Sequence, residues 1–237
     1  MDGVACRVPT INFLLSGVCH QVPEHCFYLE GRPLPLCARC MGTFLGILVG
    51  TLALCAMREG RRSRLPHWRR GGMLLALVGL WAVDGINSFV CEATGVPPLY
   101  TPSNALRLST GVGNGLAISA VLCPIFNYAM WHQVDEGRVL DRASHLIGLL
   151  LAGTCVIGVV LGWRSAPFSL WAVVLGLAVA VVLAILNGTL LALLIHKEGF
   201  ADRFLDIVPY LAGGLSAALL ETGALALLRR ALGSFGP

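Results

Sequence analysis

Six long apolar runs constrain the fold of this chain more than any other feature of its sequence. Each run has about 20 residues, the length that an α-helix needs to cross the hydrocarbon core of a bilayer. The runs lie near residues 41–57, 71–91, 106–131, 143–162, 168–195 and 207–228. Only 13% of the residues are charged, whereas soluble domains have about 25%. The sequence therefore predicts an all-α integral membrane protein with about six transmembrane helices, a multi-pass protein of the cell membrane.

The connections between the apolar runs are short, which predicts that the helices form one bundle. The segment ahead of the first run has a different character, with three prolines and one glycine between Cys19 and Cys37. Proline interrupts helices, so this segment should be a folded loop outside the membrane. We divide the chain into a Cys- and His-rich N-terminal loop segment, 1–40, and a transmembrane bundle, 41–237.

Lysine and arginine are unevenly distributed among the loops. The 58–70 loop contains six arginines, and the 132–142 and 196–206 loops add four more basic residues, against seven on the other side of the bundle. Loops rich in Lys and Arg stay in the cytoplasm. The 58–70 loop is therefore predicted to be cytoplasmic and the Cys-rich loop extracytoplasmic. The modest net charge of +4 follows this loop pattern, so we expect membrane lipid, and no nucleic acid, as a partner.

One face of the second apolar run is polar. Asp84, Asn87 and Ser88 follow the i, i+3, i+4 spacing of a helical face. A carboxylate at this depth is costly in lipid, so Asp84 should face the protein interior and have a partner there. Asn104 and Arg107 lie at the start of the third run, at the same predicted end of the bundle. We predict an Asp84–Arg107 ion pair.

Glycines at intervals of four mark two of the apolar runs. Gly42, Gly46 and Gly50 form a smooth stripe on the first run, which lets a neighbouring helix approach closely. Gly111 and Gly115 lie on the polar side of the third run. We expect this side of the third run to face the polar residues of the second.

Four metal-ligating side chains precede or open the first apolar run. Cys19, His20, Cys37 and Cys40 offer three thiolates and one imidazole, a ligand set for tetrahedral zinc. Cys26 is the substitute if His20 points away, and another transition metal is the alternative to zinc. The same residues also fit a structural disulfide such as Cys19–Cys37, or a Cys37–Cys40 pair that cycles between dithiol and disulfide.

Several motifs that occur in a fixed order resemble a known family. They are Cys-His-Gln-x-Pro at 19–23, Pro-Leu-Cys-Ala-Arg-Cys-x-Gly at 35–42, Asp-Gly at 84–85 and Ser-Asn-x-x-Arg at 103–107. Over about residues 14–120 the chain is similar to the small prokaryotic membrane proteins grouped as domain of unknown function 2085. The resemblance implies a membrane location and includes the four ligands above. Cys26 lies outside the family pattern, and the resemblance implies no reaction.

The leading functional hypothesis is a metal-dependent enzyme that acts at the outer membrane face on a lipid-like or anionic amphipathic substrate. In this hypothesis the metal activates water, Asp84 is a general base and Arg107 binds the anionic head group. Asn87, Asn104 and Glu221 complete the predicted substrate site. The alternatives are a membrane carrier or channel with the Cys-His loop as a lid, a membrane thiol–disulfide oxidoreductase, and a non-enzymatic membrane scaffold.

Overall fold

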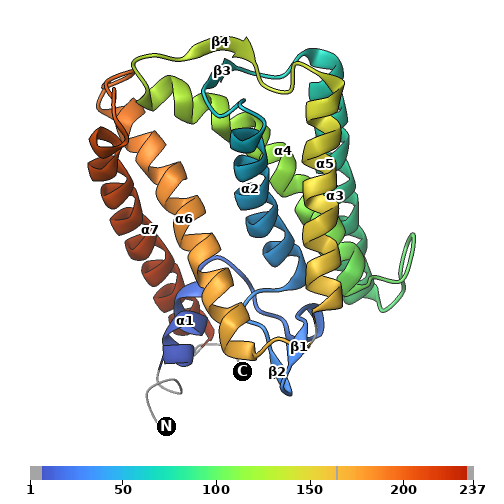
Figure 1. Ribbon diagram of the computed structural model, residues 1–237. Coiled ribbons are helices and arrows are strands. Elements are labelled where there is room, and N and C mark those ends of the chain that lie inside the picture. Colours follow the sequence, from blue (N-terminus) through green and yellow to red (C-terminus); the bar gives the residue numbers. More distant parts are fainter. Residues whose placement is uncertain (1–6, 164, 234–237) are drawn as a thin grey trace.

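Six long helices run between the two ends of a bundle in this computed structural model, which describes residues 7–163 and 165–233 (Figure 1). All six are long and apolar enough to cross a membrane. They are α2 (Ala38–Ala56), α3 (Trp68–Thr94), α4 (Asn104–Met130), α5 (Ala143–Gly162), α6 (Phe168–Leu194) and α7 (Phe204–Gly233). The predicted all-α membrane bundle is therefore confirmed. Residues 1–6 of the predicted loop segment, and residues 164 and 234–237 of the predicted bundle, lie outside the described residues.

Short elements lie at the two ends of the bundle. They are α1 (Arg7–Leu15), a 3₁₀ turn (Pro23–His25), β1 (Tyr28–Leu29), β2 (Arg32–Pro33), β3 (Arg62–Arg64) and β4 (Asp135–Arg138). The β1 and β2 strands form an antiparallel hairpin, and β3 and β4 pair in parallel. Figure 1 shows the hairpin and α1 at one end of the bundle and the β3–β4 pair at the other. The segment between Cys19 and Cys37 is thus a folded loop, as its prolines predict.

The backbones of α2 and α4 touch along their glycines. A Cβ atom added to Gly42 would lie 2.4 Å from the carbonyl oxygen of Leu108, and one added to Gly115 would lie 2.3 Å from that of Thr43. The close approach predicted for the first glycine stripe is therefore present. The expectation for α4 is wrong in one respect, because Gly111 and Gly115 face α2 and not the polar face of α3. In the most apolar 18-residue stretch of α4, 72% of the residues are buried. It is therefore the central helix of the bundle.

The outer helices expose large apolar side chains. Leu75 of α3 and Leu220 of α7 are examples, with 69% and 75% of their surface accessible. Such an extended apolar surface is stable only where hydrocarbon covers it. The exposure pattern therefore agrees with a protein embedded in a bilayer.

A buried carboxylate ties the loops together at the end that carries β3 and β4. Glu59 is 1% exposed, and its Oε2 accepts a hydrogen bond of 2.8 Å from the backbone N–H of Leu140. Its Oε1 lies 2.5 Å from His145 Nδ1 and 3.0 Å from Arg62 Nη1. Glu59 thereby joins the loop after α2 to the segment that leads into α5. Sequence reasoning missed this residue, because nothing in a polar loop distinguishes a buried acid from a solvated one.

Candidate metal centre and its polar surroundings

Three thiols meet where the N-terminal loop joins α2. The Sγ atoms of Cys19, Cys37 and Cys40 all lie within 4.8 Å of one another, and all three are free thiols. Cys37 is the N-cap of α2, so Cys40 lies in the first turn of that helix. Their convergence makes a group that could hold a metal ion.

Backbone N–H groups surround the sulfur atoms. Cys19 Sγ accepts hydrogen bonds from the backbone N–H of Cys37 at 3.2 Å and of Gln21 at 3.4 Å. The N–H of Cys40 donates to Cys37 Sγ at 3.5 Å, a bond across the N-cap. Donors that point at sulfur stabilise thiolate, the form that binds metals. The N-terminus of a helix favours negative charge in addition.

Gln21 brings the two parts of the loop together. Its backbone has a positive φ of 55°, which turns the chain directly after Cys19 and His20. Its side-chain amide donates to the carbonyl oxygens of Asn12 at 3.0 Å and of Pro35 at 2.8 Å. These two bonds fasten the end of α1 to the segment just before Cys37, which places Cys19 beside the start of α2.

His20 is not a member of the thiol group. Its side chain is exposed, and its backbone carbonyl accepts a hydrogen bond from Arg229 of α7. Cys26 is also outside the group: its Sγ donates to the carbonyl oxygen of Val22 at 3.3 Å, and burial raises its pKa to about 12. The structure thus brings together three of the four predicted ligands and neither of the two candidates for the fourth.

Cys37 is the thiol most easily ionised. A hydrogen bond from the side chain of Cys19 holds the pKa of Cys37 well below its usual range, and a further side-chain bond from Cys40 acts in the same direction. The hydrogen bond with Cys37 correspondingly raises the pKa of Cys19. A negative charge on Cys37 is therefore stabilised by the two neighbouring thiols, and a cation bound there would neutralise it.

Asp84 is fully buried and its partner is Arg39. The predicted Asp84–Arg107 pair is corrected here: Arg39 Nε donates to Asp84 Oδ2 at 3.1 Å, and Arg39 Nη2 donates to Ser88 Oγ at 3.0 Å. The phenol of Tyr100 donates to Asp84 Oδ1 at 2.9 Å. Arg39 stands inside the Cys-x-x-Cys pair, and as a cation within an apolar helix it could have been recognised as a candidate partner.

Arg107 lies beside the loop and is almost entirely buried, with 6% of its surface exposed. Its Nη1 donates to Asn104 Oδ1 at 3.0 Å, and its Nη2 lies 3.8 Å from Glu92 Oε1. Its Nε is buried and has no hydrogen-bond partner among the described residues. Asn104 in turn donates to the carbonyl oxygen of Cys26 at 3.1 Å. Arg107 is thus connected to the Cys-rich loop and retains one unused donor.

His25 extends this polar group. Its Nε2 lies 2.9 Å from Glu92 Oε1, so Glu92 faces both His25 and Arg107. Burial lowers the pKa of His25, and the nearby charge of Arg107 lowers it further. Sequence reasoning missed Glu92 and Tyr100, which lie in or next to the loop between the second and third apolar runs.

Asn87 and Glu221 lie in other settings. Asn87 Oδ1 accepts from the N–H of Leu99 at 3.0 Å, and its Nδ2 donates to the carbonyl oxygen of Tyr100 at 2.8 Å. Asn87 therefore holds the loop between α3 and α4. Glu221 is exposed on α7 and accepts from Asn187 of α6 at 3.0 Å, on the far side of the bundle from α3 (Figure 1). The substrate-binding roles of Asn87 and Glu221 stay predictions.

A cavity of about 400 Å³ opens next to the Cys-rich loop, between the hairpin, α4, α5 and α6. Its lining includes Cys26, Phe27, Tyr28, Asn104, Trp163 and Trp171. Asn104 connects this cavity to Arg107. Aromatic rings with polar edges are typical of positions where a membrane protein meets the lipid–water boundary.

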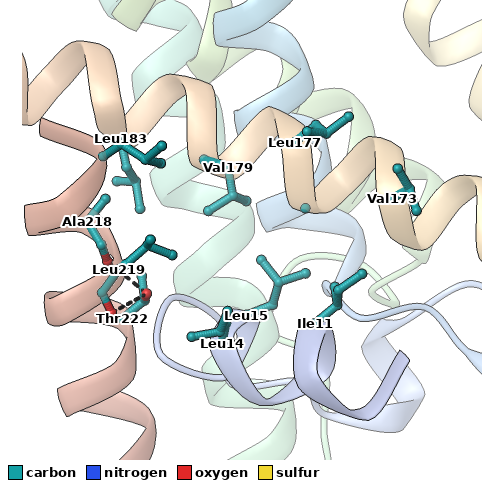
Figure 2. Close-up of a pocket in the computed structure, with 13 residues that line it drawn as sticks. Ile11, Leu14, Leu15, Val173, Leu177, Val179, Leu183, Ala218, Leu219 and Thr222 are labelled. Atoms are coloured by element: carbon teal, nitrogen blue, oxygen red, sulfur yellow. Dashed lines mark hydrogen bonds between the residues drawn. The ribbon is translucent and has the colours of Figure 1, made fainter. Parts of the chain in front are cut away.

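A second cavity on the same side of the molecule has a different character. Its volume is about 260 Å³, and Figure 2 shows the apolar side chains of α1, α6 and α7 that line it. Thr222 is its polar member, and the hydroxyl donates to the carbonyl oxygens of Ala218 and Leu219 in its own helix. This cavity therefore offers a ligand apolar contact and no polar group for chemistry.

The fold and the thiol group define a polytopic membrane protein with a Cys-rich loop at one end of its bundle. Residues 19–121 match the model of a family described as "Predicted membrane protein (DUF2085)". An uncharacterized protein of Methanothermobacter thermautotrophicus is 30% identical over 116 residues, which are 48% of this chain and 92% of that protein. The chain belongs to this DUF2085 family, and the family resemblance seen in the motifs is confirmed.

An uncharacterized protein of Methanocaldococcus jannaschii is also similar, with 30% identity over 111 residues. The match covers 47% of this chain and 65% of that protein, so the chain spans about two thirds of this relative's length. No solved structure matches the chain. The family match runs from Cys19 to Val121, and so contains the three thiols, Arg39, Asp84 and Arg107.

Proposed function

We propose that Cys19, Cys37 and Cys40 bind a zinc ion and leave its fourth coordination position open. The observation that carries this proposal is the convergence of three sulfur atoms within 4.8 Å. Structural zinc sites have four protein ligands, whereas catalytic sites have three and keep one position for water or substrate. When bound, zinc would supply the Lewis acidity that activates water or polarises a substrate oxygen.

We further propose that the protein is a membrane enzyme acting on an anionic amphipathic substrate at this end of the bundle. The buried guanidinium of Arg107, with its unused Nε donor, suits the anionic group of such a substrate. The aromatic cavity beside Asn104 suits its apolar part. Both lie next to the Cys-rich loop, so head group and metal would be close together.

Asp84 acts as a positioning residue in this proposal. Both oxygens of its carboxylate already accept hydrogen bonds, Oδ2 from Arg39 and Oδ1 from Tyr100. The Arg39 side chain that it orients belongs to the first turn of α2, between two of the proposed ligands. Asp84 therefore contributes by fixing the ligand helix, and not as the general base.

The closeness of the same thiols favours a second candidate, a thiol–disulfide oxidoreductase. Cys37 has a lowered pKa, and a thiolate with two neighbouring sulfurs is suited to form a disulfide with one of them. Oxidation of the Cys37 thiolate and the Cys40 thiol to a disulfide would release two electrons and one proton to an acceptor such as a quinone, which would take its second proton from water.

Metal content of the purified protein distinguishes the two candidates. We expect about one zinc per chain by inductively coupled plasma mass spectrometry, and loss of that zinc in Cys37→Ser and Cys40→Ser. Cys155→Ser is the matched control, because Cys155 is an exposed thiol on α5, and His20→Ala should also retain the metal. A metal-free protein whose mass falls by about 2 Da on oxidation would replace the zinc proposal with the redox one.

Turnover is tested separately on the zinc-loaded protein. We expect hydrolysis of at least one anionic phospholipid in mixed micelles, with a large loss in Arg107→Gln and partial retention in Arg107→Lys, since lysine keeps the charge. Arg64→Gln, which removes an exposed arginine of β3 at the opposite end of the bundle, serves as the control. Stoichiometric zinc without turnover of any lipid would leave a metal-stabilised carrier or scaffold in place of the enzyme.

A further inference from the structure

The end of the bundle opposite to the thiol group contains a cavity of about 520 Å³. It lies between the end of α2, the end of α4, α6 and the start of α7. Its lining includes Arg58, Arg61, Leu122, Phe126, Ile185 and Phe204, and no Asp or Glu. The two arginines follow the last residue of α2, Ala56, whereas the apolar residues Leu122, Phe126 and Ile185 belong to membrane-spanning helices. The cavity thus has a basic mouth and an apolar body.

Arg58 and Arg61 are available to a ligand. Both side chains are exposed, and among the described residues neither forms an ion pair with a carboxylate. The guanidinium carbon of Arg61 lies 3.7 Å from the ring centroid of Trp131, which orients the group, and no residue that the structure describes accepts a hydrogen bond from its side-chain N–H groups. The neighbouring arginines differ, because Arg62 pairs with Glu59 and Arg64 pairs with Glu136.

The body of the cavity offers little to a polar ligand. The hydroxyl of Thr51 donates to the carbonyl oxygen of Ile47. The side-chain amide of Asn127 donates to the carbonyl oxygen of Arg62 at 2.8 Å. Cys55 and Cys123 line the same space and behave as small apolar side chains. Hydrocarbon is the material that fits such a lining.

We propose that this cavity binds an anionic phospholipid. The phosphate would lie between Arg58 and Arg61, and one acyl chain would extend along Leu122, Phe126 and Ile185. Charge complementarity supports this occupant, because the mouth has two unpaired cations and its lining has no carboxylate. Basic pockets between transmembrane helices are suited to anionic head groups. The site lies at the opposite end of the bundle from the thiols, so it does not depend on the function proposed for them.

Lipid binding to the full-length protein tests this proposal. The detergent-solubilised protein is titrated with phosphatidylglycerol or phosphatidylcholine, and bound lipid is counted by native mass spectrometry. We expect tighter binding of phosphatidylglycerol. Arg58→Gln and Arg61→Gln should each weaken it about fivefold, since a cation near an anionic head group contributes about that factor. Inorganic phosphate at millimolar concentration should not displace the lipid, because it lacks the acyl chains.

Matched variants separate this site from general surface charge. Arg69→Gln and Arg70→Gln remove arginines at the start of α3, directly after the same basic loop, that do not line the cavity, and should leave the affinity unchanged. Ile185→Trp fills the apolar body without touching the arginines and should weaken binding, whereas Leu190→Trp, on the exposed face of the same helix, should not. Gel filtration and thermal unfolding establish that each variant is folded.

Three results would overturn the proposal. The first is equal affinity for the two lipids. The second is a loss of affinity that is the same in Arg58→Gln and Arg69→Gln, which would indicate diffuse attraction to the loop. The third is unchanged binding in Ile185→Trp, which would place the lipid outside the cavity.

Discussion

Arg39 and Asp84 form an ion pair that joins the thiol group to α3. Arg39 Nε donates to Asp84 Oδ2 at 3.1 Å, and Asp84 has no exposed surface. Because Arg39 stands between Cys37 and Cys40, this contact fixes the first turn of α2 against the neighbouring helix. The position of two candidate ligands therefore depends on a carboxylate 44 residues further along the chain than Cys40.

Replacing Asp84 should destabilise the bundle strongly. Asp84→Ala leaves the guanidinium of Arg39 without its counter-charge in an apolar setting, and we expect a loss of about 3 kcal/mol in the free energy of unfolding. Asp84→Asn keeps the shape and part of the hydrogen bonding and should cost less. Unfolding by SDS titration in mixed micelles measures both. Glu221→Ala removes an exposed carboxylate and is the control. An equal loss of unfolding free energy in Asp84→Ala and Glu221→Ala would show that the buried ion pair stabilises the protein no more than an exposed carboxylate does.

Two glycine substitutions should change stability in opposite directions. In Gly115→Ala the new Cβ would lie 2.3 Å from the carbonyl oxygen of Thr43, so α2 and α4 must separate, at a cost of about 1–3 kcal/mol or more. In Gly79→Ala the Cβ meets nothing within 4 Å, and the better helix propensity of alanine should stabilise by about 0.5–1 kcal/mol. Thermal unfolding of the two variants in the same detergent checks this contrast. Similar changes in both would contradict backbone contact between α2 and α4.

The number and approximate position of the six helices could be predicted from the sequence, because hydrocarbon sets a minimum length for each apolar run. The thiols were predictable as well, since the Cys-x-x-Cys spacing at a helix start turns both side chains toward one side. The partner of Asp84 could not be predicted. Arg39 and Arg107 are both arginines near the same end of the bundle, and the choice depends on which helix the glycines of α4 face.

His20 shows a second limit of sequence reasoning. It follows Cys19 directly, and adjacent residues rarely point the same way, so its direction depends on the turn at Gln21. The positive φ of Gln21 is a property of the folded loop that residue spacing does not reveal. Arg229 of α7 then binds the carbonyl oxygens of Cys19 and His20, a contact between residues at opposite ends of the chain.

Removing Glu59 should destabilise the end of the bundle that carries β3 and β4. Glu59→Ala leaves Arg62, His145 and the backbone N–H of Leu140 without their shared acceptor, and the expected loss is about 3 kcal/mol. Glu136→Ala is the matched control, because Glu136 pairs with Arg64 at the surface, where both side chains are mostly exposed, and such pairs contribute about 0–1 kcal/mol. Amide hydrogen exchange should show faster opening of the β4 segment in Glu59→Ala alone. Protection that is unchanged there would mean that Glu59 does not hold these loops.

The stability of the Cys-rich loop should fall as the pH is lowered through the ordinary pKa of histidine, about 6.5. The charged groups around His25 are Glu92 on α3, Arg107 on α4, and Arg39 and Cys37 at the start of α2. Burial comes first among the causes that lower the pKa of His25, and Arg107 adds to it. Between about pH 6.5 and the lowered pKa of folded His25, the unfolded state therefore binds more protons than the folded state, and acidification through this window favours unfolding.

Thermal unfolding between pH 5 and pH 8 tests this pH dependence. The wild-type midpoint should be highest above the ordinary histidine pKa and should fall on acidification, whereas His25→Gln, which lacks the titrating ring, should show a smaller fall. His196→Gln replaces an exposed histidine near the other end of the bundle and should follow the wild type. If the midpoint of His25→Gln falls with pH as steeply as that of the wild type, the acid sensitivity has another origin. The folded protein then stabilises the charged and the neutral form of His25 equally well beside Glu92.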